Sequence, residues 1–228
     1  MSKALRIAGI LVLSLVLCSA ASWAAPSLAV TAGAALNGTS FGLAVNFDNT
    51  AGNAYVETLH PTDETHYLAR FWLHPGNVSI DPGVSVRFGA IGDDTQGQHI
   101  ILFLKHDNAV ATAQYQMNFW FKDKALSGAY RFGGATYLSD VSTPCARQYE
   151  VEWTADTLAG TSGNGTLVVR RLADAGSCGS GALVTRTVSS MDTDGWQIDN
   201  ARFGTLNGAQ SANGNSGAIR FDEFESYR

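Results

Sequence analysis

The chain is a succession of short segments in which apolar and polar residues alternate, separated by residues that favour turns. Such alternation is typical of strands with one buried face, and Gly, Asn, Asp and Pro mark the turns between them. We expect strands at 43–47, 65–73, 85–91, 100–105, 113–122, 127–132, 148–153, 166–172, 183–188, 198–205 and 218–227. No segment has the pattern of a long helix. The sequence therefore predicts an all-β protein of two packed antiparallel sheets, and we expect its closing strand to lie inside a sheet.

The first 24 residues have the composition of a secretory leader. Lys3 and Arg6 precede an apolar run at 7–17, and small residues at 20–24 predict cleavage after Ala24. The apolar run is too short to cross a bilayer as a mature helix. We therefore expect an exported protein, periplasmic or extracellular, in which residues 25–228 form a single domain without a membrane span.

The charge of the chain argues against a nucleic-acid partner. The sequence has 15 Lys and Arg residues against 20 Asp and Glu residues, and loss of Lys3 and Arg6 with the leader leaves a net charge of −7. Proteins that bind nucleic acids need a basic surface to pair with phosphates. No such excess of basic residues is present here.

Two cysteines, Cys145 and Cys178, remain after removal of the leader. An even pair in an exported chain favours a disulfide, because that compartment is oxidising. A zinc or redox site would need a closer cysteine spacing or nearby histidines. We therefore predict a Cys145–Cys178 disulfide.

The segments 149–153, 165–170, 188–195, 198–204 and 219–228 follow one another in an order that is similar to a known family. Together with the strand at 67–71, they resemble the bacterial concanavalin A-like lectin/glucanase (laminin-G-like) jelly-roll proteins. The resemblance implies a two-sheet jelly-roll sandwich that covers most of the mature chain. It leaves the function open, because this fold hosts lectins, hydrolases, lyases and adhesive modules.

Hydrolases of this fold carry two carboxylates on one face of a strand, a nucleophile and a general acid. Glu150 and Glu152 share a face, as do Glu223 and Glu225, but each pair also fits the polar outer face of a half-buried strand. The spacing differs from that of the family.

Lyases of this fold resemble one another in an arginine-bearing strand, a Gln-x-His strand and a late tyrosine-bearing strand, which together neutralise a uronate and move a proton. The nearest candidates are Arg70, Gln98, His99 and either Tyr130 or Tyr137. Gln98 and His99 are adjacent and would face opposite ways. We therefore expect a protein without catalytic residues, with a glycan-cleaving enzyme as the alternative.

Two expected strands combine polar and aromatic side chains on one face, as sugar-binding sheets do. In 113–122, amides and an indole lie opposite the apolar face, and 65–73 repeats the arrangement with a histidine, an arginine and an indole. A neighbouring arginine could add a positive charge. The predicted ligand-binding residues are His66, Arg70, Trp72, Gln116, Asn118, Trp120 and Arg131. The sequence thus predicts a module that binds a glycan or a cell-surface polysaccharide, or else a structural envelope module with no small ligand.

Calcium is the metal that this sequence could bind. Asp192 and Asp194, followed by Gly195, could supply oxygen ligands to calcium, although the same residues are common in hairpin turns. We expect no other cofactor.

Overall fold

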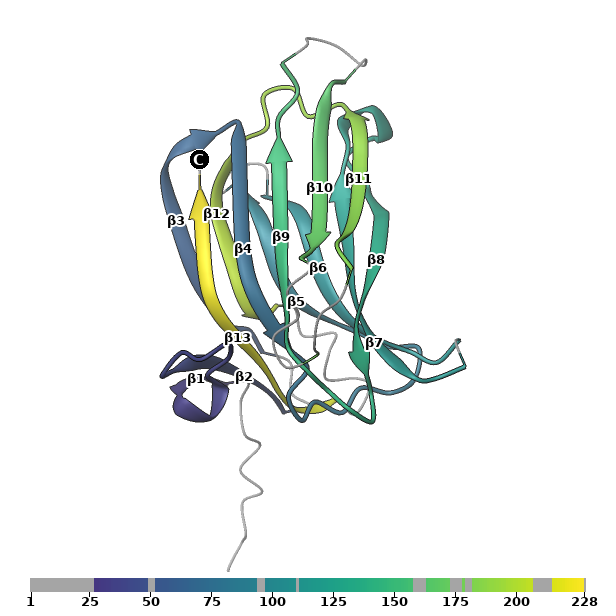
Figure 1. Cartoon of the computed structure of the whole chain (residues 1–228). Helices are drawn as coiled ribbons and strands as arrows, with labels where there is room; N and C mark the ends of the chain where they lie inside the picture. The colour runs from purple at the N-terminus through teal and green to yellow at the C-terminus, as the bar shows by residue number, and fades with distance from the viewer. Residues whose placement is uncertain are drawn as a thin grey trace, which may run out of the picture.

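The computed structural model describes residues 27–48, 52–93, 97–109, 111–157, 163–172, 178, 182–206 and 215–227. These residues form two antiparallel sheets packed face to face, with two short 3₁₀-helices, η1 (Ala32–Ala34) and η2 (Lys124–Leu126) (Figure 1). The predicted leader and its cleavage point lie outside the described residues. Within the described part of the chain, no helix is long and apolar enough to cross a membrane.

The first sheet has seven strands in the order β1-β2-β13-β4-β9-β10-β11. The final strand lies between β2 and β4, which confirms that the chain closes inside a sheet. The strands are β1 (Ser27–Thr31), β2 (Gly42–Asp48), β13 (Ser216–Tyr227), β4 (His66–His74), β9 (Arg147–Thr154), β10 (Gly165–Arg171) and β11 (Val184–Met191).

The second sheet has six strands in the order β3-β12-β5-β6-β7-β8. Its strands are β3 (Ala54–Glu64), β12 (Ile198–Thr205), β5 (Ser85–Asp93), β6 (Gly97–Asp107), β7 (Gln114–Lys122) and β8 (Tyr130–Asp140). The two-sheet prediction is confirmed, and each of the eleven expected segments overlaps a strand. The strands β1 and β3 were not predicted.

The core fills the space between the sheets with the inward side chains of both. Phe71 of β4 packs against Phe88 of β5 and Phe203 of β12, with ring centroids 6.4 and 5.1 Å away. His99 is also buried there, stacked on Trp153 and Trp196 at centroid distances of 5.8 and 4.6 Å. The core therefore joins β4 and β9 of one sheet to β5, β6 and β12 of the other.

The sandwich is closed along the edge where β8 meets β11. Cys145 and Cys178 form the predicted disulfide, with their Cα atoms 5.1 Å apart. The Arg186 Nε atom on β11 donates a hydrogen bond to the Ala135 carbonyl on β8 at 3.1 Å. The 33-residue separation gives the disulfide a stabilising effect of about 3–4 kcal/mol in the chain-entropy model.

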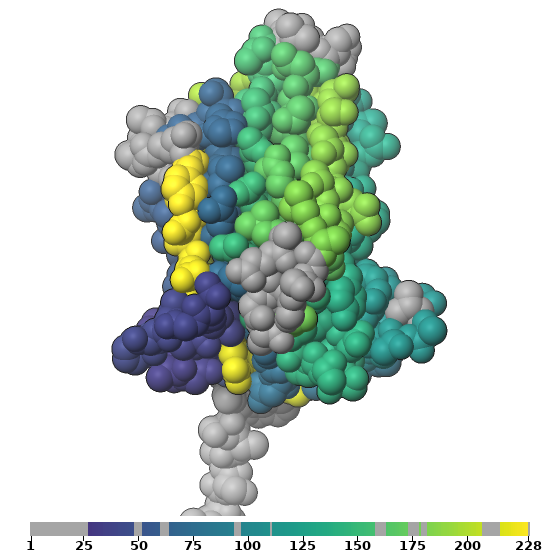
Figure 2. Space-filling view, viewed as in Figure 1, coloured from purple at the N-terminus to yellow at the C-terminus, as the bar shows by residue number. Residues whose placement is uncertain are grey.

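The segment between β1 and β2 packs on the outer side of the seven-stranded sheet. The Leu36 amide donates to Asp222 Oδ2 at 2.6 Å, which attaches the segment to β13. Leu36 also forms a small buried cluster with Trp72 and Ala146. In Figure 2 this purple segment lies across the lower part of the yellow strand β13.

Candidate functional site

The predicted ligand-binding residues lie on the two opposite outer faces of the sandwich. His66, Arg70 and Trp72 alternate with core residues on β4, in the seven-stranded sheet whose outer face is seen in Figure 2. Gln116, Asn118 and Trp120 alternate with core residues on β7, in the six-stranded sheet. The core separates these two sets, so they cannot form one site.

Trp72 is not available for a ligand, because only 1% of its surface is exposed. Leu36 and Ala146 cover the indole, whose Nε1–H donates to Glu223 Oε2 at 2.8 Å. The expected sugar-stacking surface on β4 is therefore corrected: this indole anchors the amino-terminal segment.

The charged side chains next to Trp72 pair with one another. Glu150 accepts hydrogen bonds from Arg70 Nη2 at 2.7 Å and from Arg170 Nη1 at 2.6 Å. Arg170 also lies 2.7 Å from Glu152, which in turn lies 3.2 Å from His66 Nε2. The hydrogen bond from Arg170 holds the pKa of Glu152 below its usual value. Both carboxylates are therefore engaged by guanidinium groups.

The other predicted face, on β7, keeps its tryptophan accessible. Trp120 is 36% exposed, and its ring lies edge-on to that of Phe132 on β8, with centroids 5.7 Å apart. The Gln116 amide donates to Asp107 Oδ2 at 2.6 Å, and Asn118 is largely buried. Sugar binding by these three residues stays a prediction.

Arg131 does not belong to this face. It pairs in register with Phe121, whose side chain lies in the core. Side chains directly opposite each other in an antiparallel pair lie on the same side of the sheet. This corrects the expectation that Arg131 adds its charge next to Trp120. It is instead exposed at the edge strand, on the side opposite to Trp120.

A second polar cluster on the six-stranded sheet was not predicted as a unit. Arg87 of β5 donates from Nη2 to the side-chain oxygen of Gln98 on β6. The Tyr130 hydroxyl of β8 donates to the Gln98 carbonyl at 2.7 Å, and the Lys122 amine lies 5.1 Å from the centroid of the Tyr130 ring. Four strands therefore bring an arginine, an amide, a lysine and a phenol together beside Trp120.

Partial burial shifts the pKa values of two residues in this cluster. Burial raises the pKa of Tyr130, and the nearby Arg87 charge opposes that shift. Burial also lowers the pKa of the Arg87 guanidinium, while Tyr130 acts in the opposite direction. Tyr130 is therefore a neutral phenol at neutral pH, held among cationic groups.

The structure assembles only part of the expected lyase pattern. Gln98 and Tyr130 come together, but Arg70 lies on the other sheet, and the arginine that contacts Gln98 is Arg87. His99 points inward, because the pairing of β5 with β6 shifts register between Ile91 and Gly92. Tyr137 instead donates its hydroxyl to Asp140 at 3.1 Å. The alternation of Arg87 with buried neighbours was the one available signal for the residue that was missed.

The proposed calcium ligands lie in a turn. The Asp192 amide donates to Asp123 Oδ1 at 3.2 Å, and Lys124 Nζ donates to the Asp194 carbonyl. Among the described residues, no three His, Cys, Asp or Glu side chains are grouped closely enough to hold a metal ion. Calcium binding by Asp192 and Asp194 stays a prediction.

No protein-family model and no curated protein sequence matches this chain. Solved structures do match it over most of its length. The alginate lyase from Klebsiella pneumoniae is 11% identical, with a TM-score of 0.55, and the match covers 85% of this chain and 83% of that one. The PL-14 alginate lyase from Aplysia kurodai is 9% identical, with a TM-score of 0.52 and coverages of 88% and 86%. The alginate lyase vAL-1 from Chlorella virus is 9% identical, with a TM-score of 0.51 and coverages of 88% and 92%.

The fold is a jelly-roll sandwich. The expectation from the concanavalin A-like resemblance is thus confirmed at the level of architecture. At these identities the likeness establishes the fold alone.

Proposed function

We propose that this protein is a polysaccharide lyase that acts on an acidic polysaccharide at the outer face of the six-stranded sheet. The observation that carries the proposal is the cluster of Arg87, Gln98, Lys122 and Tyr130 next to the exposed ring of Trp120. The cluster combines cations for a carboxylate, a hydroxyl that can exchange a proton and a ring that can stack on a sugar.

The charge of this face supports an anionic substrate, even though the chain has a net charge of −5. Lys105 and Arg202 on the same face are already paired, with Asp107 at 3.6 Å and Glu57 at 2.6 Å. Lys122 has no carboxylate partner within the described part of the chain, and its amine lies over an aromatic ring. A uronate carboxylate would supply the missing negative charge.

The proposed reaction is a β-elimination. Arg87 and Lys122 neutralise the uronate carboxylate, which makes the adjacent carbon-bound proton more acidic. A water molecule at this solvent-exposed face takes the proton, the bond to the glycosidic oxygen breaks, and a carbon–carbon double bond forms. Tyr130, whose pKa is raised by burial, keeps its proton until it donates it to the departing oxygen, and it then recovers a proton from solvent.

The structural neighbours support the same class of reaction, since three of them are named as alginate lyases. The Cys145–Cys178 disulfide supports export, where a polysaccharide outside the cytoplasm would be accessible. Both points favour cleavage over the non-catalytic binding that we expected from the sequence.

A second candidate function is glycan binding without cleavage. It is favoured by the exposed edge-to-face pair of Trp120 and Phe132, because aromatic faces stack on sugar rings whether or not chemistry follows. Both candidates use the same face, so one set of variants tests them together.

The decisive experiment measures unsaturated uronate by ultraviolet absorbance when the purified protein is incubated with alginate, pectate and hyaluronan. We expect activity on one of these polymers, and Tyr130→Phe should lower kcat about 100-fold or more, as loss of a general acid does. The matched control is Tyr227→Phe, an exposed tyrosine on the seven-stranded sheet, which should leave kcat unchanged.

Two outcomes would count against the lyase. Equal loss of activity in both tyrosine variants contradicts the proposed site, and absence of product from every acidic polymer contradicts cleavage. In the second case, affinity electrophoresis with the same polymers tests the binding function, where Trp120→Ala should abolish retardation.

A further inference from the structure

The edge of the sandwich formed by β1 and β3 is open, unlike the edge formed by β8 and β11. β1 is the outermost strand of the seven-stranded sheet and β3 that of the six-stranded sheet, and both lie on the same side of the molecule (Figure 1). No register pairs them, because each hydrogen-bonds only to its inner neighbour within the described residues. The space between the sheets is thus accessible from this side.

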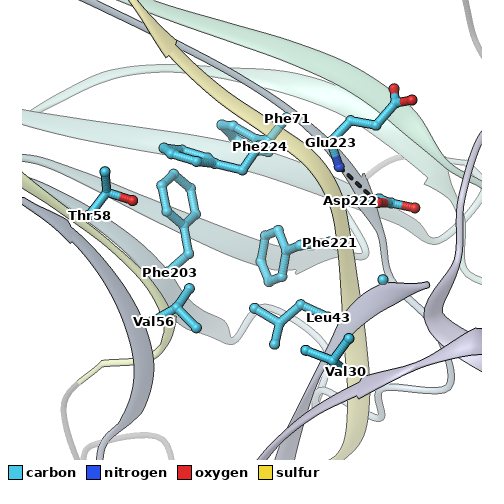
Figure 3. Close-up of a pocket in the computed structure, with 11 residues that line it drawn as sticks. Val30, Leu43, Val56, Thr58, Phe71, Phe203, Phe221, Asp222, Glu223 and Phe224 are labelled. Atoms are coloured by element: carbon cyan, nitrogen blue, oxygen red, sulfur yellow. Dashed lines mark hydrogen bonds between the residues drawn. The ribbon is translucent and has the colours of Figure 1, made fainter. Parts of the chain in front are cut away.

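A cavity of about 310 Å³ occupies this open edge. Its wall is almost entirely apolar, and the exposed side chains of Val30 and Val56 form its rim. Figure 3 shows the side chains that surround it. The lining residues are Val30, Gly42, Leu43, Val56, Thr58, Phe71, Phe203, Phe221, Asp222, Glu223 and Phe224.

The inner wall of the cavity is aromatic. The Phe203 ring lies 4.9 Å from that of Phe224, 5.1 Å from that of Phe71 and 5.9 Å from that of Phe221, measured between centroids. These rings belong to β12, β13 and β4, so both sheets contribute to the wall. The rings fix the shape of the cavity, because each is held by at least one other ring.

A β-bulge in β13 keeps charge out of the cavity. The register between β13 and β4 shifts between Asp222 and Glu225, and Glu223 has a φ of 46°. Regular alternation from the inward Phe221 would turn Glu223 toward the cavity. The bulge instead brings Phe224 inward, against the core. A positive φ at a non-glycine residue is unfavourable, and here it places a ring where a carboxylate would otherwise lie.

The two carboxylates at the bulge already have partners outside the cavity. Asp222 accepts from the Leu36 amide at 2.6 Å and from the Thr39 hydroxyl, and Glu223 accepts from the Trp72 indole. In Figure 3 both carboxyl groups point away from the rings. The carboxyl groups of the described lining residues therefore face away from the rings of the cavity, and Thr58 contributes a side-chain hydroxyl.

We propose that this cavity binds the alkyl tail of an uncharged amphiphile. A closed apolar cavity of about 150 Å³ stays dry and accepts benzene, so a space of twice that volume suits a chain of several methylene groups. The open rim leaves a polar head group in water. This ligand site is independent of the proposed lyase face, which is built on β5–β8.

The test uses tetraethylene glycol monooctyl ether, which is uncharged and contains no sugar, below its critical micelle concentration. Methyl NMR spectra of the full protein should show saturable shifts of Val30, Leu43 and Val56 on titration. Val56→Asp, at a position already 43% exposed, places a charge at the rim and should weaken binding about tenfold or more.

The matched control is Leu59→Asp. Leu59 lies on the same strand and is 66% exposed, but it does not line the cavity, so this variant should bind like the wild type. The proposal is overturned if the wild type shows no saturable shifts, or if Leu59→Asp weakens binding as much as Val56→Asp. It is also overturned if sedimentation reveals a dimer that both substitutions dissociate, since a second copy would then cover this edge.

Discussion

The two outer faces of the sandwich both carry charged side chains, but the partners of those charges differ. On the seven-stranded sheet, Glu150 binds two arginines and Arg170 binds two glutamates, so positive and negative charges are matched within the face. On the six-stranded sheet, Lys122 and Arg87 surround a neutral phenol and an amide. The seven-stranded face therefore carries a network of paired charges, whereas Lys122 on the six-stranded face has no carboxylate partner among the described residues.

This difference teaches that charged residues on a strand face are poor indicators of a ligand site by themselves. Arg70 and Glu150 looked like candidates from the sequence, yet each is satisfied by the other. A residue signals a site when its neighbours leave its charge unmatched. The contrast can be tested through stability on one face and through binding on the other.

The largest expected effect on stability is that of Glu150→Gln. This nearly buried carboxylate joins Arg70 and Arg170, so its removal leaves two guanidinium groups poorly paired. We expect a loss of about 2 kcal/mol, less than for a fully buried pair because both arginines reach solvent. The change is measured by urea unfolding, and binding or cleavage of polysaccharide should be unchanged.

Glu225→Gln is the matched control, because Glu225 lies on the same sheet face and is exposed. It should cost less than about 0.5 kcal/mol. If the two substitutions cost the same, the ion-pair network does not stabilise the seven-stranded sheet.

The strands that the sequence predicted are those with one buried face. The segment 65–73 alternates strictly, and β4 buries Tyr67, Ala69, Phe71 and Leu73 accordingly. The two missed strands, β1 and β3, are the outermost strands on one side, and many of their residues are exposed. An edge strand needs little alternation, since it is held by backbone pairing with one neighbour. The sequence pattern therefore did not predict the open edge or its cavity.

The candidate site was only partly predictable from the sequence. The alternation of apolar and polar residues is visible within one segment, whereas the order of strands in a sheet depends on segments that are far apart in the chain. Alternation correctly grouped Gln116, Asn118 and Trp120 on one face of β7. It could not reveal that β4 belongs to the other sheet, paired with β13 and β9. It also could not reveal that Leu36, from an irregular segment, covers Trp72.

Register shifts caused the remaining differences. Shifts in the pairing of β5 with β6 and of β13 with β4 interrupt the regular alternation near His99 and near Glu223. A bulge moves every following side chain to the other face, and no residue pattern marks its position. The inward position of His99 and that of Phe224 are both consequences.

A smaller effect on stability is expected on acidification. Burial lowers the pKa of His99, against the opposing charge of Asp93, and burial lowers the pKa of His74 to about 4. Both histidines are thus neutral in the folded protein, whereas the unfolded chain takes up protons near pH 6.5. The unfolded state binds more protons below that pH, so stability should fall as the pH drops from about 7.5 to about 5.5.

Urea unfolding at both pH values measures this slope. The His99→Gln variant should retain the part of the pH dependence that is due to His74. In the double variant with His74→Gln, the free energy of unfolding should be nearly independent of pH in this window. The arginine–carboxylate pairs of the opposite face do not titrate there. An unchanged slope in the double variant would show that other groups cause the acid sensitivity.

We expect the smallest effect on stability for Lys122→Gln. This substitution is also the most direct test of the contrast between the two faces. The Lys122 amine lies over the Tyr130 ring and forms no ion pair with a carboxylate among the described residues, so its loss should cost less than about 1 kcal/mol. Binding of an acidic polysaccharide should nevertheless weaken and become less sensitive to salt, because an unmatched cation is lost. Lys105→Gln is the control, since Lys105 lies on the same face but is already paired with Asp107 at 3.6 Å. If both lysines contribute equally to polysaccharide binding, pairing within the sheet does not decide which cations are available to a ligand.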